Sequence, residues 1–102
     1  MLYFNRLNPS ELERLSILSE ECGEVVHIIG KILRHGYDSF YDSNGDNREL
    51  LEKECGDIMA AIKLLYDTGD LDNNIIYDHS LTKRLNLRKW THHQDWKELD
   101  GY

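Results

Sequence analysis

The apolar residues in the first third of the chain recur at intervals of three and four, which is the spacing of one face of an α-helix. A similar stripe follows over residues 50–65, and a weaker one over 75–87. Strand-like alternation is absent, and the single proline, Pro9, stands at an expected helix start. The sequence therefore predicts an all-α domain. The first stripe comprises Leu12, Leu15, Leu18, Cys22, Val25, Ile29, Ile32 and Leu33.

Capping signals divide the chain into three predicted helices. The first begins at Asn8-Pro9-Ser10-Glu11, where Asn8 can cap and Glu11 can complete a capping box, and it ends at Gly36. It could instead break into two helices near residues 16–19. The second runs from Asp46 or Asn47 to about Thr68, and the third from about residue 74 to 90. Because the connections are short, we expect an antiparallel helical bundle.

The length and charge of the chain limit the number of domains and the kinds of partner that we expect. We expect 102 residues to form a single domain, 1–102, with a core over about 9–90 and a tail over 91–102. So small a core is often completed by oligomerisation. The net charge of −7 argues against a protein that coats nucleic acid. With neither a signal peptide nor a membrane-spanning run, we expect a cytoplasmic protein whose two cysteines are free and mostly buried.

Two tetrapeptides are near copies of each other, Glu21-Cys22-Gly23-Glu24 and Glu54-Cys55-Gly56-Asp57. On helices, each places two carboxylates three residues apart on one face. Four carboxylates from two packed helices would suit a hard divalent cation such as Mg²⁺ or Mn²⁺. The enclosed glycines are unfavourable in a helix and suggest a close helix approach. The alternative is a solvated acidic face.

The pattern Glu20-Glu21-x-x-Glu24, followed by Glu54-x-x-Asp57, resembles the EExxE…ExxD signature of the MazG-like all-α nucleoside triphosphate pyrophosphohydrolases. That superfamily also holds dimeric dUTPases and phosphoribosyl-ATP pyrophosphohydrolase. The resemblance spans about residues 12–89 and is strongest to the small single-domain phage and bacterial proteins. The gap between the two halves of the signature is slightly longer than is usual for the family, which indicates an enlarged loop over 37–47.

The resemblance implies a role for each matching residue. Glu21, Glu24, Glu54 and Asp57 would ligate Mg²⁺, for which Mn²⁺ could substitute, and Glu20, Glu21 and Glu54 would serve catalysis. Lys83 would bind phosphate, with Arg84, Arg88 and Lys31 as further candidates. The reaction would convert a nucleoside triphosphate to the monophosphate and pyrophosphate, in a homodimer or homotetramer. From the residues themselves, Tyr37, Phe40, Tyr41 and Trp90 could stack on a base, or pack the loop or an interface.

Two other functions fit the same residues. One is a phosphoribosyl-ATP pyrophosphohydrolase, which uses a similar set of acids. The other is a non-catalytic helical module whose acids hold a structural Mg²⁺ or nothing.

Overall fold

The first helix, α1, spans Pro9–His35 in the computed structural model, which describes residues 4–39 and 45–101. Asn8 caps it as predicted: its Oδ1 accepts from the backbone N–H of Glu11 at 2.8 Å, and the Glu11 carboxylate accepts from the N–H of Asn8 at 3.0 Å. The helix is continuous, so the alternative break near residues 16–19 does not occur. Gly36 ends it at a φ of +88°, a backbone conformation that favours glycine.

The second helix, α2, spans Asn47–Asp67. Asp46 caps it by accepting from the backbone N–H of Glu49 at 2.9 Å. The predicted ends at 46 or 47 and at about Thr68 are therefore confirmed to within one residue. Local capping chemistry sets the start, because the Asp46 side chain satisfies an N–H group that has no partner inside the helix.

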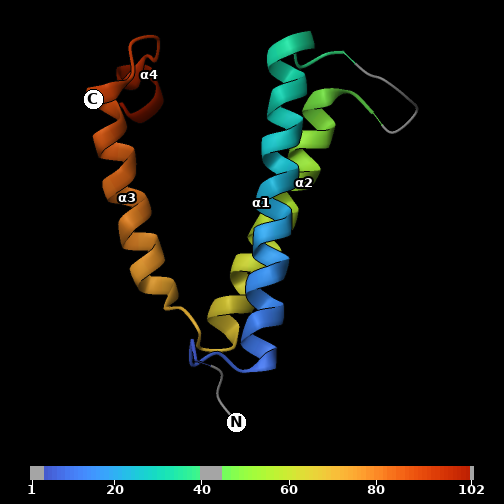
Figure 1. Cartoon of the computed structure of the whole chain (residues 1–102). Coiled ribbons are helices and arrows are strands. Elements are labelled where there is room, and N and C mark those ends of the chain that lie inside the picture. The colour runs from blue at the N-terminus through green and yellow to red at the C-terminus, as the bar shows by residue number, and fades with distance from the viewer. Residues whose placement is uncertain (1–3, 40–44, 102) are drawn as a thin grey trace. The chain divides into compact units, whose positions relative to one another are not determined.

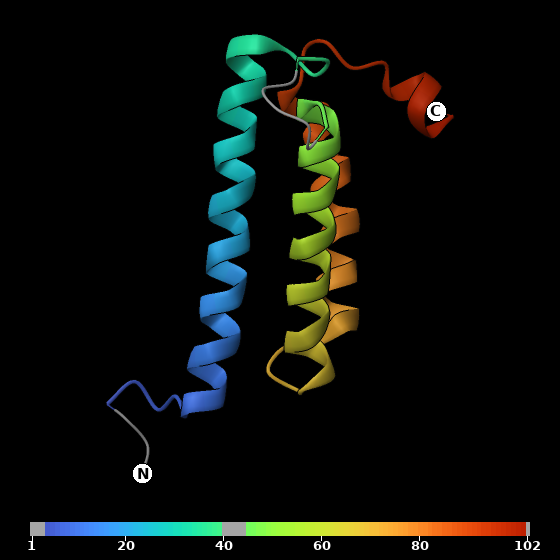
Figure 2. The ribbon, with the colours of Figure 1, turned by 90° about the vertical axis from the view of Figure 1, so that its right-hand side faces the viewer.

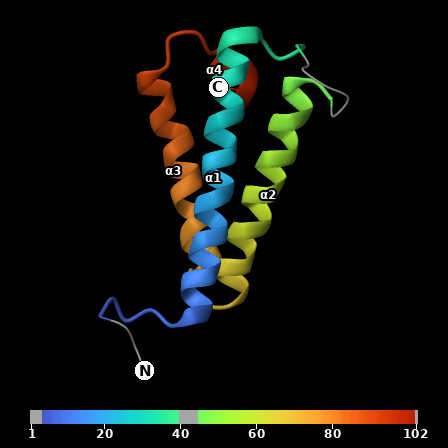
Figure 3. The same cartoon turned by 45° about the vertical axis from the view of Figure 1, so that its right-hand side comes forward.

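Together α1 and α2 form an antiparallel helical hairpin, which is the first of two compact units of the chain, residues 1–70 (Figures 1 and 3). Its described core is small and consists of Ile28 on α1 with Ala61 and Leu65 on α2. Leu65 is 1% exposed. So few buried side chains mean that each one carries a large share of the packing energy.

Polar contacts fasten both ends of this hairpin. At the turn, the buried Asn47 side chain donates from Nδ2 to the carbonyl oxygen of Gly36 at 3.0 Å. At the opposite end, Arg14 donates from Nε and Nη2 to the two carboxylate oxygens of Asp70 at 2.6 and 3.0 Å. This guanidinium holds the pKa of Asp70 below its ordinary value, through the hydrogen bond first and its charge second. The register of α1 against α2 is thereby fixed at two points.

The predicted apolar stripe of α1 is only partly the buried face. Val25, Ile32 and Leu18 are half-buried, and Ile28, which the prediction omitted, is buried. The prediction was wrong for the others, because α1 carries two neighbouring apolar stripes and sequence periodicity does not tell which one faces α2. The prediction of mostly buried thiols was also wrong, since both cysteines are exposed: Cys22 lies on the outer stripe of α1, and Cys55 is exposed on α2. The exposed members of the predicted stripe are Leu12, Leu15, Cys22, Ile29 and Leu33.

The second unit, residues 71–102, contains α3 (Asn73–Trp90) and α4 (Trp96–Asp100). Helix α3 matches the predicted third helix, whereas α4 lies in the tail, for which no periodicity was found. The Trp96 indole donates to the Thr91 hydroxyl at 2.9 Å and so fixes the start of α4. All regular elements among the described residues are helices, which confirms the all-α class (Figure 2). None of these helices is long and apolar enough to span a membrane.

Candidate metal centre

Three carboxylates from the two repeated tetrapeptides meet across the helical hairpin. Glu21 projects from α1, and Glu54 and Asp57 project from α2, with one ligand oxygen of each within 4.8 Å of the other two. Glu54 and Asp57 share a face of α2 because they are three residues apart. The Glu54 side chain is 13% exposed and that of Asp57 40%. We call these three residues the acidic cluster.

The cluster borders a depression of about 330 Å³ on the first unit. Its lining combines Glu21 and Asp57 with Ile17, Leu64 and the small side chains of Ala60 and Ala61. Partial burial, and then the negative charges of Asp57 and Glu54, raise the pKa of Glu21 above its ordinary value. Carboxylates that face one another in this way repel, and a cation between them would relieve that repulsion.

The donor set fits a hard divalent ion. Mg²⁺ prefers carboxylate oxygens at about 2.0–2.1 Å, which places opposite ligands of an octahedron about 4.2 Å apart. The oxygens of the acidic cluster lie within 4.8 Å of one another, so small side-chain rotations would bring them to those distances. No histidine or thiol belongs to the group, and this favours Mg²⁺ or Mn²⁺ over Zn²⁺.

The other two acids predicted for this site lie outside the cluster. Glu24, the predicted fourth ligand, is exposed, and so is Glu20. Among the described residues of the first unit, the glycines of the two tetrapeptides do not mark a close helix approach, contrary to our expectation. A Cβ built on Gly23 or Gly56 meets no atom within 4 Å, and both residues are exposed.

Lys53, which was not among the predicted site residues, contacts the acidic cluster directly. Its Nζ lies 2.7 Å from Oδ2 of Asp57 and 3.4 Å from Oε1 of Glu54. The hydrogen bond to Asp57, followed by the charges of Asp57 and Glu54, raises the pKa of Lys53. Its position in the sequence could have identified it, because Lys53 lies four residues before Asp57, and this is the spacing of an ion pair on a helix.

The remaining predicted substrate contacts are spread over both units. On the first unit, Lys31 is half-buried on α1, and Tyr37 is 49% exposed with the Arg48 guanidinium 4.9 Å from its ring centre. On the second unit, Lys83 and Trp90 are exposed on α3. Phe40 and Tyr41 lie outside the described residues.

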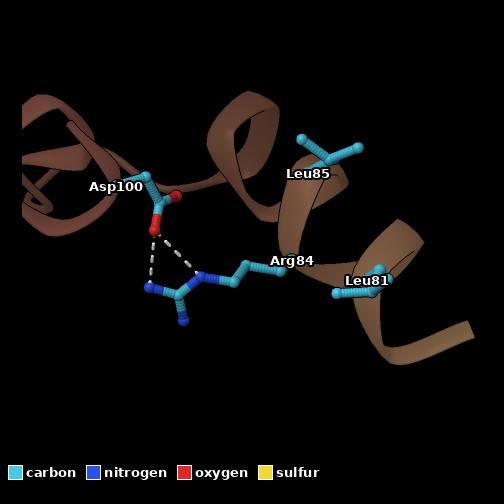
Figure 4. A pocket seen from close by; sticks show the side chains of 4 residues that line it. All are labelled: Leu81, Arg84, Leu85 and Asp100. Atoms are coloured by element: carbon cyan, nitrogen blue, oxygen red, sulfur yellow. Dashed lines mark hydrogen bonds and ion pairs between the residues drawn. The ribbon is translucent and has the colours of Figure 1, made fainter. Parts of the chain in front are cut away.

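Arg84 and Arg88 already hold an anion, the carboxylate of Asp100. Arg84 donates from Nε and Nη2 to Oδ1 of Asp100 at 3.2 and 2.9 Å (Figure 4). Arg88 donates from Nη2 to Oδ2 of the same carboxylate at 2.7 Å. Both guanidinium groups also lie over the Trp96 ring, 5.4 and 5.6 Å from its centre. The hydrogen bond from Arg84 and the charges of both arginines lower the pKa of Asp100. These contacts fasten α4 to α3, and Figure 4 shows Leu81 and Leu85 beside them, lining a cavity of about 350 Å³.

Comparison of the chain with known protein families, with curated proteins and with solved structures found no match.

Proposed function

We propose that this chain is a Mg²⁺-dependent nucleoside triphosphate pyrophosphohydrolase of the MazG-like kind, serving nucleotide-pool control or house-cleaning. The observation that carries the proposal is the convergence of Glu21 with Glu54 and Asp57. These are three of the four acids that the signature assigns to the metal. They come from two helices and could have pointed away from each other, so their meeting within 4.8 Å supports the proposed site.

The proposed chemistry follows from the charges involved. Hydrolysis between the α- and β-phosphates consumes one water and gives a nucleoside monophosphate and pyrophosphate. A triphosphate carries about four negative charges, and a divalent ion supplies the charge neutralisation and acidifies the attacking water. The acidic cluster would hold this ion, and the exposed Glu20, next to Glu21, would orient the water. Lys83 is the proposed phosphate ligand, whereas Arg84 and Arg88 would have to exchange Asp100 for phosphate.

We further propose that the enzyme is a homodimer or homotetramer. The support is an exposed, largely apolar stripe along the whole of α1, whose members alternate intervals of three and four residues. Val26 is 70% and Leu33 82% exposed on this stripe. Such a heptad pattern is typical of a helix that packs against another helix, and the small core leaves the pattern unpartnered within the hairpin. The stripe comprises Leu12, Leu15, Ser19, Cys22, Val26, Ile29 and Leu33.

The test is a substrate panel with a matched pair of variants. Purified protein is incubated with Mg²⁺ and each common ribo- and deoxyribonucleoside triphosphate, dUTP and phosphoribosyl-ATP, and the products are separated by ion exchange. We expect monophosphate and pyrophosphate without diphosphate, and a mass in solution of two or four chains. Glu54→Gln should lower turnover at least about a hundredfold, since even residues that only support metal ligands contribute about 10–100-fold. The control, Glu52→Gln, changes an exposed acid of the same helix and should keep full activity.

Each outcome bears on a different part of the proposal. Turnover of phosphoribosyl-ATP alone would favour the phosphoribosyl-ATP enzyme. Undiminished activity in Glu54→Gln would contradict the assignment of the acidic cluster. Absence of turnover with every substrate, in Mg²⁺ and in Mn²⁺, would favour a non-catalytic helical module.

A further inference from the structure

The described part of the first unit places one ammonium group directly on the acidic cluster. Lys53 reaches Asp57 at 2.7 Å and Glu54 at 3.4 Å, so it contacts two of the three carboxylates proposed to bind the metal. Its side chain is 65% exposed, which leaves it free to move into solvent. Without a metal, the positive charge next to Glu54 and Asp57 is therefore supplied by the chain itself.

A divalent ion and this ammonium compete for the same two carboxylates, those of Glu54 and Asp57. Oδ2 of Asp57 accepts the shorter of the two Lys53 contacts, and a carboxylate oxygen that ligates a metal at about 2.1 Å has little room for a cation beside it. An ion carrying two charges also repels the ammonium. Lys53 must therefore leave the acidic cluster when the metal enters. It stays nearby, because it directly precedes Glu54 in the chain.

We propose that Lys53 is an internal competitor for the metal ion and that, once displaced, it binds a phosphate of the substrate. Both steps rest on the proposed function, because the first requires the metal ion at the acidic cluster and the second requires a phosphorylated substrate there. The second step makes Lys53 a substrate-binding residue, one that changes partner from carboxylate to phosphate when the metal and the substrate bind. A lysine suits this exchange, since its ammonium is a compact charge on a flexible stem.

The chain offers a matched control in Lys63. Lys63 lies on the same helix and pairs with Asp67 at 2.6 Å, with the same four-residue spacing and with a similar exposed fraction of 61%. Asp67 does not belong to the acidic cluster. Lys53→Met and Lys63→Met therefore each remove one ion pair of four-residue spacing and keep the aliphatic stem. Lys53→Met also removes the contact with Glu54, and Lys63→Met removes a contact with the Tyr66 ring at 5.7 Å, but only Lys53→Met changes the proposed metal site.

The first measurement is metal affinity without nucleotide, by titration of Mn²⁺ followed by electron paramagnetic resonance, at low and high salt. We expect Lys53→Met to bind Mn²⁺ about threefold to tenfold more tightly than wild type, because exposed ion pairs contribute up to about fivefold and residual charge repulsion adds to this. The difference should shrink at high salt, and Lys63→Met should match wild type. Equal or weaker Mn²⁺ binding by Lys53→Met would overturn the competitor role.

The second measurement is binding of a non-hydrolysable triphosphate analogue to the protein saturated with Mn²⁺. We expect Lys53→Met to bind it about tenfold more weakly, a loss typical of a charged hydrogen bond. Unchanged binding would overturn the phosphate role. These failures are distinct from failure of the proposed metal site, which would show as wild-type protein that binds no Mn²⁺, and from failure of the proposed activity, which would show as wild-type protein that hydrolyses no triphosphate. Circular dichroism of both variants checks that they fold.

Discussion

Truncation of Leu65 to alanine tests whether the helical hairpin depends on its small core. Leu65 is the most buried of the three core hydrophobics at 1% exposed, and it lies on the helix that carries Glu54 and Asp57. Losing a buried leucine side chain and leaving a cavity costs about 3 kcal/mol, within a range of about 2–5 kcal/mol. A hairpin of this size has a total stability of roughly 4–10 kcal/mol at about 0.05–0.15 kcal/mol per residue. The variant should therefore lose a third or more of its stability.

The assay is urea unfolding followed by circular dichroism, together with thermal melting. A loss of about 3 kcal/mol corresponds to a melting temperature lower by about 12–24 °C for a domain of this size. The control is Leu64→Ala, because Leu64 is the preceding residue but is 39% exposed. We expect it to lose less than about 1 kcal/mol. Equal losses in the two variants, or a loss below about 1 kcal/mol for Leu65→Ala, would refute the reasoning that this core holds α1 against α2.

The same variant connects stability to the proposed metal site. An ion held by Glu21 of α1 together with Glu54 and Asp57 of α2 binds only when the two helices are packed. Binding to the folded state alone stabilises it by about 2.7 kcal/mol at a metal concentration about 100 times the Kd. Saturating Mg²⁺ should therefore restore most of what Leu65→Ala loses. A metal that leaves the melting temperature of the variant unchanged would contradict the bridging role.

Two further predictions concern the acidic cluster and the tetrapeptide glycines. Because the pKa of Glu21 is raised above its ordinary value of 4.5, its ionisation removes stability as the pH rises past that value. In chelator at neutral pH, Glu21→Gln should therefore melt higher than wild type, and the two should melt alike below the ordinary pKa of a glutamate. The variant should also no longer gain stability from Mg²⁺. A lower melting temperature at neutral pH would contradict this. Gly23→Ala and Gly56→Ala should each stabilise the chain by about 0.5–1 kcal/mol in urea unfolding, since a Cβ there meets nothing within 4 Å. Destabilisation by either would contradict the conclusion that the added Cβ has open space.

The helix ends were predictable because they depend on neighbouring residues. Asn8 and Asp46 cap their helices through hydrogen bonds to residues three positions away, and such local contacts can be predicted from a sequence. The short helix α4 was not predictable from the sequence, because five residues are too few to show a helical period. The contacts that hold it also come from a distance, since Arg84 and Arg88 lie at least twelve positions from Asp100.

The acidic cluster was predictable in part. Spacing placed Glu54 and Asp57 on one face of α2, but only the packing of α1 decided that Glu21, and not the exposed Glu24, meets them. The orientation of α1 also depends on the ion pair between Arg14 and Asp70, which are separated by 56 positions. No local pattern predicts such a contact.

The two polar contacts that hold the ends of the hairpin differ in when they can form during folding. The Asn47–Gly36 contact closes a loop of 11 residues, whereas the Arg14–Asp70 contact closes one of 56. By the (3/2)RT ln n relation, the longer closure costs about 1.4 kcal/mol more in chain entropy. The Asn47–Gly36 contact should therefore form early, and the two helices should then pack progressively toward the end that holds Arg14 and Asp70. Substitution of Asn47 would then mainly slow folding, and substitution of Asp70 would mainly speed unfolding.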